Sequence, residues 1–313
     1  MKTVEGYNVK IYTDNIEDSA IEQIKKLLSI DVFSKCKIRI MPDVHAGAGC
    51  VIGFTGDLGD KVIPNIVGVD IGCGILVQPF VCVNDIDYHA LNEFILHDIP
   101  SGRNYRDNRS APLPQKYMDV YCEAKNIIKQ LRCYRELKET KRLNASIGSL
   151  GGGNHFIELD KDECGMTYLV VHTGSRNFGK QVAQIYQKLA VKCQSGWAEL
   201  MEEQNRMIAA YEGQKCIISL SMRDGVLICI SKGHVEWNCS APHGAGRIEP
   251  DFQKYQLERL CQFYAGNLYG MRERRKDESP MMYKSKEEII RNISEKVSVM
   301  NEIESVYNFK VAG

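Results

Sequence analysis

The sequence predicts a mixed α+β fold, and two observations lead to this class. Short apolar runs that suit strands gather with glycine-rich loops in the middle of the chain, and longer stretches with helical spacing lie around them. Neither an internal repeat nor a linker-like stretch divides the 313 residues. We therefore expect a single domain over residues 1–313, with central β-sheets and long flanking helices.

The composition narrows the class of protein. The 40 Lys and Arg residues balance the 40 Asp and Glu residues, so any site for a polyanion must come from a local cluster of charge. The 12 cysteines follow no short regular framework, which is typical of reduced thiols in a cytoplasmic protein. The first residues show no apolar signal segment, and no run reaches about 18 apolar residues, so we expect no membrane span.

Residue spacing predicts the elements of the N-terminal part. Residues 1–13 alternate between apolar and polar side chains and suit a strand or hairpin. Asp14 or Asn15 is expected to cap a helix that ends near Leu28. Three apolar runs suit strands, and the first leads into a glycine-rich loop at 42–49; the runs are residues 38–41, 51–54 and 66–69.

Helical patterns alternate with strands in the rest of the chain. Helices are expected at residues 86–97, 115–143 and about 179–211. Strands are expected at residues 168–172, and at 217–220 and 226–230 around a turn at 223–225. Residues 101–114 suit an exposed loop, whose arginines either lie in solvent or contact a phosphate backbone; they are Arg103, Arg106 and Arg109.

The most informative segment runs from Gly148 to Glu158 and reads GSLGGGNHFIE. Its glycines let backbone N–H groups approach an anion closely, because no Cβ stands in the way. Asn154, His155 and Glu158 would then lie where a bound group is recognised. We interpret the segment as part of one site for a metal ion and a nucleotide phosphate, which Asp70, Cys73, His172 and His243 complete.

Four of these residues are candidate metal ligands. Asp70 and Cys73 could reach one ion or bridge two, although a capping aspartate and a buried cysteine would show the same pattern. His155 ends the glycine loop and His172 ends an apolar strand, at places where ligand-binding side chains commonly lie. Thiolate and imidazole disfavour Mg²⁺, whereas carboxylate and phosphate oxygens suit Mn²⁺, so we expect Mn²⁺ first and Zn²⁺ second.

His243 lies in the segment SAPHGAGR, where a proline and two glycines restrict the backbone around it. Its imidazole could act as a nucleophile toward phosphorus, as a general base or as a third metal ligand. Arg247 could pair with a phosphate as a planar fork. The sequence contains no GxxxxGK[ST] segment, so it is not a P-loop protein.

Five segments, in the same order, resemble motifs of the RtcB-type RNA-splicing ligases. They are MPDVHAG from Met41, VGVDIGCG from Val67, GGGNHFIE from Gly151, VHTGSR from Val171 and HGAGR from His243. Residues 277–284 and 307–310 resemble the C-terminal part of the same family. The resemblance implies a compact α+β domain around a site for two manganese ions.

The resemblance also implies an activity. This is the GTP- and Mn²⁺-dependent joining of RNA 3′-phosphate or 2′,3′-cyclic phosphate ends to 5′-hydroxyl ends, as in tRNA splicing and RNA repair. It implies that His243 accepts the guanylate, and that the metal ligands are Asp70, Cys73, His155 and His172, with Cys73 bridging both ions. The implied guanylate-contacting positions are Asn154, His155, Glu158, Ser221, Gly244, Ala245, Gly246, Arg247, Tyr283 and Lys310.

Two stretches depart from the family pattern. No histidine lies between His172 and His234, so the family's third metal-binding histidine is missing, as if a segment near residue 209 were deleted. After Arg247, the residues IEPDF replace a Met-Ser-Arg stretch. These departures keep two alternatives open: a metal-dependent phosphoesterase that acts on RNA ends, and an inactive RNA-end-binding homologue. We expect a monomer, and the need for an activating protein partner stays open.

Overall fold

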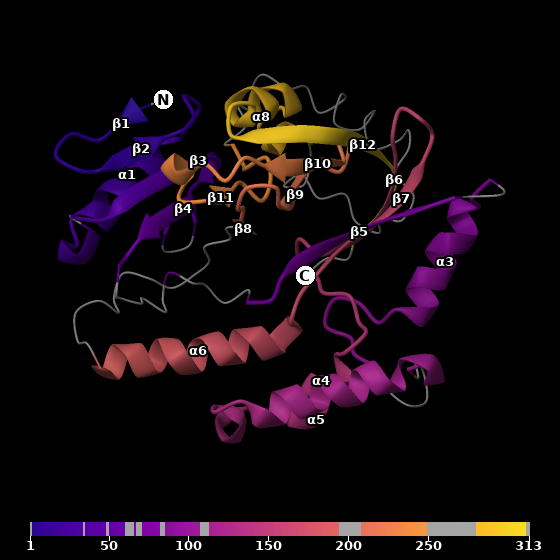
Figure 1. The fold of residues 1–313 in the computed structure, drawn as a ribbon. Coiled ribbons are helices and arrows are strands. Elements are labelled where there is room, and N and C mark those ends of the chain that lie inside the picture. Colours follow the sequence, from indigo (N-terminus) through magenta and orange to yellow (C-terminus); the bar gives the residue numbers. More distant parts are fainter. Residues whose placement is uncertain are drawn as a thin grey trace.

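The computed structural model describes residues 2–33, 35–47, 50–59, 66, 71–81, 85–106, 113–193, 208–248 and 280–310. It confirms the α+β fold class that the sequence predicts (Figure 1). The first of two larger sheets has the order β1-β2-β3-β4, and within it β2 and β3 run parallel. Its strands are β1 (Lys2–Thr3), β2 (Val9–Ile11), β3 (Lys37–His45) and β4 (Ile52–Asp57).

The second sheet has the order β5-β7-β6-β12-β10-β9, and all of its neighbouring strands are antiparallel. Its strands are β5 (Gly74–Phe80), β6 (Phe156–Lys161), β7 (Thr167–Thr173), β9 (Lys215–Ser219), β10 (Val226–Ser231) and β12 (Val297–Lys310). A small third sheet pairs β8 (Ile208–Ala209) with β11 (Ser240–Ala241).

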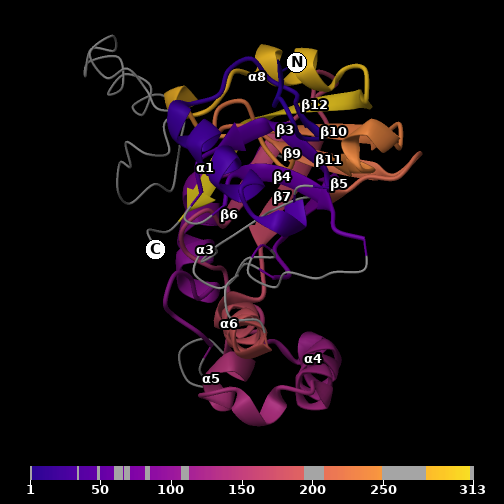
Figure 2. The same cartoon turned by 90° about the vertical axis from the view of Figure 1, so that its left-hand side faces the viewer.

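The helices lie on different sides of these sheets. The α-helices of the described ranges are α1 (Asp18–Leu28), α3 (Tyr88–Asp98), α4 (Met118–Gln130), α5 (Thr140–Ala145), α6 (Arg176–Cys193) and α8 (Lys286–Ile293). Short 3₁₀ helices are η1 (Asp31–Phe33), η2 (Gln115–Tyr117), η3 (Tyr134–Glu136), η5 (Val235–Trp237) and η7 (Pro280–Met282). In both views α4, α5 and α6 gather at one end of the molecule, and α8 lies at the other (Figures 1 and 2). Within the described ranges, no helix has the length and apolar character needed to cross a membrane.

The apolar cores follow from the residue spacing. In α1, Ala20, Ile24 and Leu27 recur at helical intervals and pack with Ile38 and Ile40 of β3. A second core cluster includes residues of both larger sheets and of the elements between them: Met41, Ile218, Leu227, Trp237 and Ile289. Because Met41 belongs to β3, this cluster fixes the end of the first sheet against the second.

Two expectations for the N-terminal part are wrong. Helix α1 begins at Asp18, and neither Asp14 nor Asn15 caps it; the Asn15 side chain donates to Glu288 instead. Strand β3 continues to His45, so the expected glycine loop at 42–49 is extended backbone in its first half. The register of β3 against β4 is irregular between Ile40 and His45, around a proline that has no N–H to donate.

Other boundaries also differ from expectation. The stretch 115–143 is broken into η2, α4, η3 and the start of α5, and residues 208–209 pair as strand β8 instead of extending a helix. Strands β6 and β12 were not predicted, because glycines hide the start of β6 and charged residues interrupt the alternation of β12. Residues 67–69 and 194–207 of the expected strand and helix lie outside the described residues.

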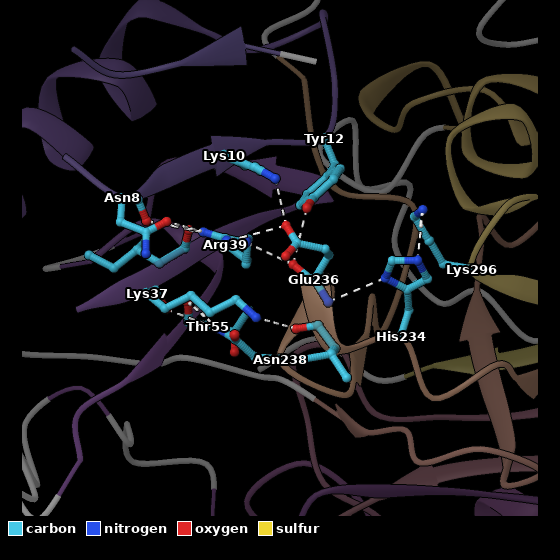
Figure 3. A network of polar contacts seen from close by, with 12 residues as sticks. Asn8, Lys10, Tyr12, Lys37, Arg39, Thr55, His234, Glu236, Asn238 and Lys296 are labelled. Atoms are coloured by element: carbon cyan, nitrogen blue, oxygen red, sulfur yellow. Dashed lines mark hydrogen bonds and ion pairs between the residues drawn. The ribbon is translucent and has the colours of Figure 1, made fainter. Parts of the chain in front are cut away.

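A polar network joins the first sheet to η5, next to the second sheet (Figure 3). Arg39 of β3 is buried, and its guanidinium donates to the backbone oxygens of Glu236 at 2.8 Å and of Asn8 at 3.0 Å. Lys10 and Arg39 also form ion pairs with the Glu236 carboxylate. The network therefore holds β2 and β3 to a segment that follows them by about 200 residues.

Arg39→Ala is expected to lower the free energy of unfolding by about 2–4 kcal/mol, because it removes a buried guanidinium and the hydrogen bonds that it donates to backbone carbonyls of Asn8, Ile38 and Glu236. Urea denaturation followed by circular dichroism measures this loss. The control variant Glu236→Gln keeps the backbone oxygen that Arg39 contacts and changes only an exposed carboxylate, so we expect a much smaller loss. Equal losses in the two variants would contradict this account of the network.

Candidate functional site

A cavity of about 940 Å³ lies where the two larger sheets meet the loop 243–247. Most of the residues that the sequence singles out line it: Cys73, Asn154, Glu158, His172, Ser221, His243, Gly244, Ala245, Gly246, Arg247, Tyr283 and Lys310. His155 lies next to Cys73, and Asp70 lies outside the described residues. The structure thus brings together segments that are far apart in the sequence.

Cys73, His155 and His172 form a cluster in which one potential ligand atom of each lies within 4.8 Å of the others. The Cys73 Sγ lies 3.1 Å from Nε2 of His155, and the two imidazole rings meet edge to face at 5.2 Å between centroids. The sheet register explains this meeting. His172 of β7 lies between Ile75 of β5 and Phe156 of β6, so Cys73 and His155, just before those strands, reach the same point.

The protonation of this cluster suits a metal ion. Nδ1 of His172 lies 2.8 Å from the carbonyl oxygen of Asn154, so Nδ1 carries the hydrogen and Nε2 keeps its lone pair. Burial lowers the pKa of His155 and of His172 to about 4, so both imidazoles are neutral at pH 7. Burial also raises the pKa of the Cys73 thiol to about 11. Two neutral imidazoles and an ionisable thiol are a donor set that transition-metal ions favour over Mg²⁺.

The glycine loop has a different role from the expected one. Of residues 148–154, only Asn154 lines the cavity, so the loop glycines do not face it. A Cβ added at Gly151 would lie 1.6 Å from Nδ1 of His155. Because Gly151 has no Cβ, the His155 imidazole can occupy this space. The loop therefore supports the Cys73–His155–His172 cluster without facing the cavity.

His243 lies at the cavity with a buried aspartate behind it. Its Nδ1 is 2.9 Å from Oδ2 of Asp43, and its backbone N–H donates to the same oxygen at 3.3 Å. These two contacts place the Asp43 carboxylate beside Nδ1, and a carboxylate at this distance favours the tautomer with the hydrogen on Nδ1 and the lone pair on Nε2. Asp43 thus orients the imidazole, as in other oriented histidine sites.

The position of Asp43 depends on two further residues. Gly246 has a φ of +74°, and a Cβ added there would lie 2.2 Å from the backbone oxygen of Asp43. The buried amine of Lys284 donates to the backbone oxygens of Pro42 at 2.6 Å and of Val44 at 3.0 Å. Burial lowers the pKa of this amine to about 8, against the opposing charge of Asp43. The C-terminal end of β3, which carries Asp43, is therefore fixed by the close approach of Gly246 and by the hydrogen bonds from Lys284.

Strands β6 and β12 form another wall of the cavity. Asn308 lies directly opposite Glu158, and both of these side chains are buried. Arg247 lies over the ring of Tyr283, with 5.6 Å between the guanidinium carbon and the ring centroid. The Ser221 hydroxyl donates to Oδ2 of Asp224 at 2.6 Å. The cavity thus has buried polar groups on one wall and a stacked Arg–Tyr pair on another.

Several other candidates lie elsewhere or have other partners. Arg106 donates to the backbone oxygens of Gly148 at 2.9 Å and Asp98 at 3.3 Å, so it braces a turn. Arg103 is exposed, and Arg109 lies outside the described residues. His234 does not line the cavity: its Nδ1 accepts from the backbone N–H of Glu236, and its Nε2 lies 3.1 Å from Nζ of Lys296 (Figure 3).

Three residues near the site had no role in the sequence interpretation. Asp43 and His45 belong to the segment MPDVHAG, but nothing in the sequence signals that Asp43 meets a histidine 200 residues later. His45 lines the cavity and donates from Nδ1 to the backbone oxygen of Asp43 at 2.8 Å. Asn308 became visible only through the pairing of β12 with β6.

The fold and the cavity define an α+β protein with a candidate Cys/His metal centre that shares its cavity with an aspartate-oriented histidine. A sequence profile of the tRNA-splicing ligase RtcB family matches residues 23–210. The chain belongs to this family. The match covers more than half of the chain and includes the segments that carry Asp43, Cys73, His155 and His172.

Curated relatives agree with this assignment. The chain is 30% identical over 201 residues to the RNA-splicing ligase RtcB of Escherichia coli K12, covering 61% of this chain and 49% of the relative. It is 27% identical over 220 residues to the tRNA-splicing ligase RtcB of Methanococcus maripaludis, with 58% and 46% covered. An RNA-splicing ligase RtcB homolog 2 of Entamoeba dispar is 29% identical over 196 residues, with 48% and 37% covered. The chain spans about half the length of the bacterial relative, and less of the others.

Removing the Cys73 thiol is expected to change how the protein binds a divalent ion. Because the thiol is protonated at pH 7 and a ligand must be a thiolate, binding should release about one proton per ion and strengthen as the pH rises. Calorimetric titration with Co²⁺ in buffers of different ionisation enthalpy measures the protons, and absorption spectra show the thiolate–cobalt band. Cys73→Ser should lose the band and the proton. A band that persists in Cys73→Ser would rule out Cys73 as the ligand, and Cys122→Ser, at an exposed cysteine, is the control.

Proposed function

We propose that this protein is a GTP- and Mn²⁺-dependent RNA ligase that joins RNA 3′-phosphate or 2′,3′-cyclic phosphate ends to 5′-hydroxyl ends through a guanylyl-histidine. One observation carries the proposal: Cys73 and His172 of the Cys73–His155–His172 cluster line the same cavity as the oriented His243. Family membership and the names of the relatives support the same activity. The cavity volume suits a nucleotide, because small-molecule sites commonly measure about 300–1,000 Å³.

The donor set supports a metal-dependent reaction. Cys73, His155 and His172, together with Asp70, would hold the manganese that the reaction needs. Bound metal supplies positive charge that neutralises phosphate oxygens during transfer. The neutral imidazoles offer lone pairs at pH 7, and the hydrogen bond from His172 to Asn154 fixes one of them in the correct tautomer.

His243 would attack the α-phosphorus of GTP through Nε2. An N–P bond forms, the bond to the bridging oxygen of the β-phosphate breaks, and pyrophosphate leaves with the electron pair. The hydrogen on Nδ1 stays on the ring, where the Asp43 carboxylate stabilises the cationic product. Arg247 and Lys310 line the cavity and would neutralise phosphate charge.

The guanylyl group would then move to the RNA 3′-phosphate. A phosphate oxygen attacks the guanylyl phosphorus, and the N–P bond to His243 breaks. The 5′-hydroxyl of the second RNA attacks the activated 3′-phosphate, loses its proton to solvent or a base, and GMP departs. A cyclic phosphate end must first be opened by water, for which the same metal site would serve.

One observation keeps the phosphoesterase alternative open. Within the described residues the cluster contains three ligands, and the position of the family's third histidine has no counterpart in the sequence. A site with a missing ligand could still open a cyclic phosphate without transferring guanylate. RNA carrying a cyclic phosphate distinguishes the two functions, because the phosphoesterase gives a 3′-phosphate product without GTP and the ligase gives joined RNA with it.

The first test is labelling with GTP that carries radioactive phosphorus at the α position. We expect an acid-labile label on the protein in the presence of Mn²⁺, because a phosphorus–nitrogen bond to histidine hydrolyses in acid. His243→Ala should abolish the label, and His234→Ala, at the network of Figure 3, should keep it. A label that survives in His243→Ala would show that another residue is the nucleophile.

Asp43→Asn tests the orientation of the imidazole. The amide has the size of the carboxylate, but it does not hold the Nδ1–H tautomer or stabilise the cationic product, so labelling should slow by about 10²–10⁴-fold. The rate of label incorporation at saturating GTP measures the effect. Nucleotide affinity should change far less than the rate, and an unchanged rate would remove Asp43 from the mechanism.

A further inference from the structure

Two acidic side chains lie next to each other beneath the cavity. Glu158 and Asp160 are two positions apart on β6, so they share one face of the strand. Glu158 lines the cavity, whereas Asp160 lies two positions farther along the strand and does not. Their exposed fractions are 2% and 0%, which is unusual for carboxyl groups unless they are paired or neutral.

Few hydrogen-bond donors reach the Glu158–Asp160 pair. Within the described ranges, neither oxygen of Asp160 has a hydrogen-bond partner, and the same is true of Oε1 of Glu158. Burying an ionised carboxylate without donors costs several kcal/mol, so such a group usually takes up a proton or finds a partner. A proton held between the two side chains would supply the missing donor for both.

The neighbouring strands favour a charge on Glu158 over one on Asp160. On β12, Asn308 lies opposite Glu158 and Ser305 opposite Asp160, and Lys310 lies opposite Phe156, two positions before Glu158. On β7, Val170 lies opposite Glu158, and Tyr168 lies opposite Asp160. The Tyr168 hydroxyl donates its hydrogen to Asp162 and therefore does not donate it to Asp160. His172, two positions beyond Val170 on the same face, is neutral at pH 7 because burial lowers its pKa.

The direction of each shift agrees with this asymmetry. Burial raises the pKa of both carboxyls, and the neighbouring Glu158 raises that of Asp160 further. The polar side chains of Ser305 and Asn308 and the charge of Lys310 oppose this rise in the pKa of Glu158. Of the two groups, Asp160 is therefore the better place for a proton.

We propose that Asp160 is a positioning residue that carries a proton in the folded protein and hydrogen-bonds through it to Glu158, keeping Glu158 an ionised acceptor in the nucleotide cavity. This inference rests on the proposed function, because it concerns the base of the nucleotide that the cavity would bind. Guanine presents two neighbouring donors on its Watson–Crick edge, the ring N1–H and the exocyclic amine. An ionised carboxylate can accept hydrogen bonds from both of these guanine groups. A protonated carboxyl would instead direct its O–H toward a guanine donor, which cannot accept it. The proton on Asp160 would thus favour guanine over adenine.

Infrared spectroscopy tests the proton without any nucleotide. At pH 8 ordinary carboxyls are ionised, so the carbonyl band of a protonated carboxylic acid identifies a buried acid. We expect this band in the unmodified protein, its loss in Asp160→Asn, and its persistence in Glu158→Gln. A band that is lost in Glu158→Gln and kept in Asp160→Asn, or one that is absent from the unmodified protein, would overturn the proposal.

Nucleotide binding tests the consequence. Asp160→Asn keeps a donor next to Glu158, so its affinity for GTP and its preference over ATP should stay within about threefold. Asp160→Leu removes the donor, so GTP should bind about 10–100-fold more weakly at pH 7, with affinity recovering as the pH rises. If Asp160 were ionised and repelled Glu158, both variants would instead bind GTP more tightly, which would refute the proposal. Circular dichroism checks that each variant is folded.

The two proposals fail in different ways. An unmodified protein that shows the acid band but binds neither GTP nor ATP in Mn²⁺ would refute the proposed function and leave the proton on Asp160. A protein that binds GTP but lacks the band, or places it on Glu158, would refute the role of Asp160 and leave the proposed ligase.

Discussion

The pairing of β12 with β6 is the interaction on which the cavity depends. These strands are far apart in the sequence, and their register places Asn308 beside Glu158 and Lys310 beside Phe156. A slip of one residue would turn every β12 side chain to the other face of the sheet. Because β12 also pairs with β10, the same strand joins the side of the sheet that carries the Cys73–His155–His172 cluster to the strands near Ser221.

The sequence predicts the parts of this site that depend on local residue types. Glycine-flanked Cys73, His155 and His172 were recognisable because strand ends that open into polar loops commonly carry ligands, and the structure brings them together. The strands with clear apolar runs were likewise predictable. Strand β12 was not, since its charged residues face solvent on one side and the cavity on the other, which disrupts simple alternation. The contact of Asp43 with His243 depends on tertiary packing alone.

Buried polar groups surround the cavity on several sides. Asp43, Glu158 and Asp160 are buried acids. Lys284 is a buried amine that donates to backbone oxygens. Each of these groups costs free energy when it is transferred from water, so the surrounding sheet must hold it in place. Local rules of burial are broken most often where a protein binds or transforms something, and here the exceptions gather at one place.

The cavity also lies across the boundary between the two larger sheets. His45 belongs to the first sheet, Phe156 and His172 belong to the second, and the loop 243–247 closes the space between them. A ligand that contacts all three parts holds the two sheets and the loop together. Such a ligand binds the folded chain and not the unfolded one, so occupancy and folding are thermodynamically linked. A protein whose cavity is filled would then resist heat and proteolysis better than the same protein with its cavity empty.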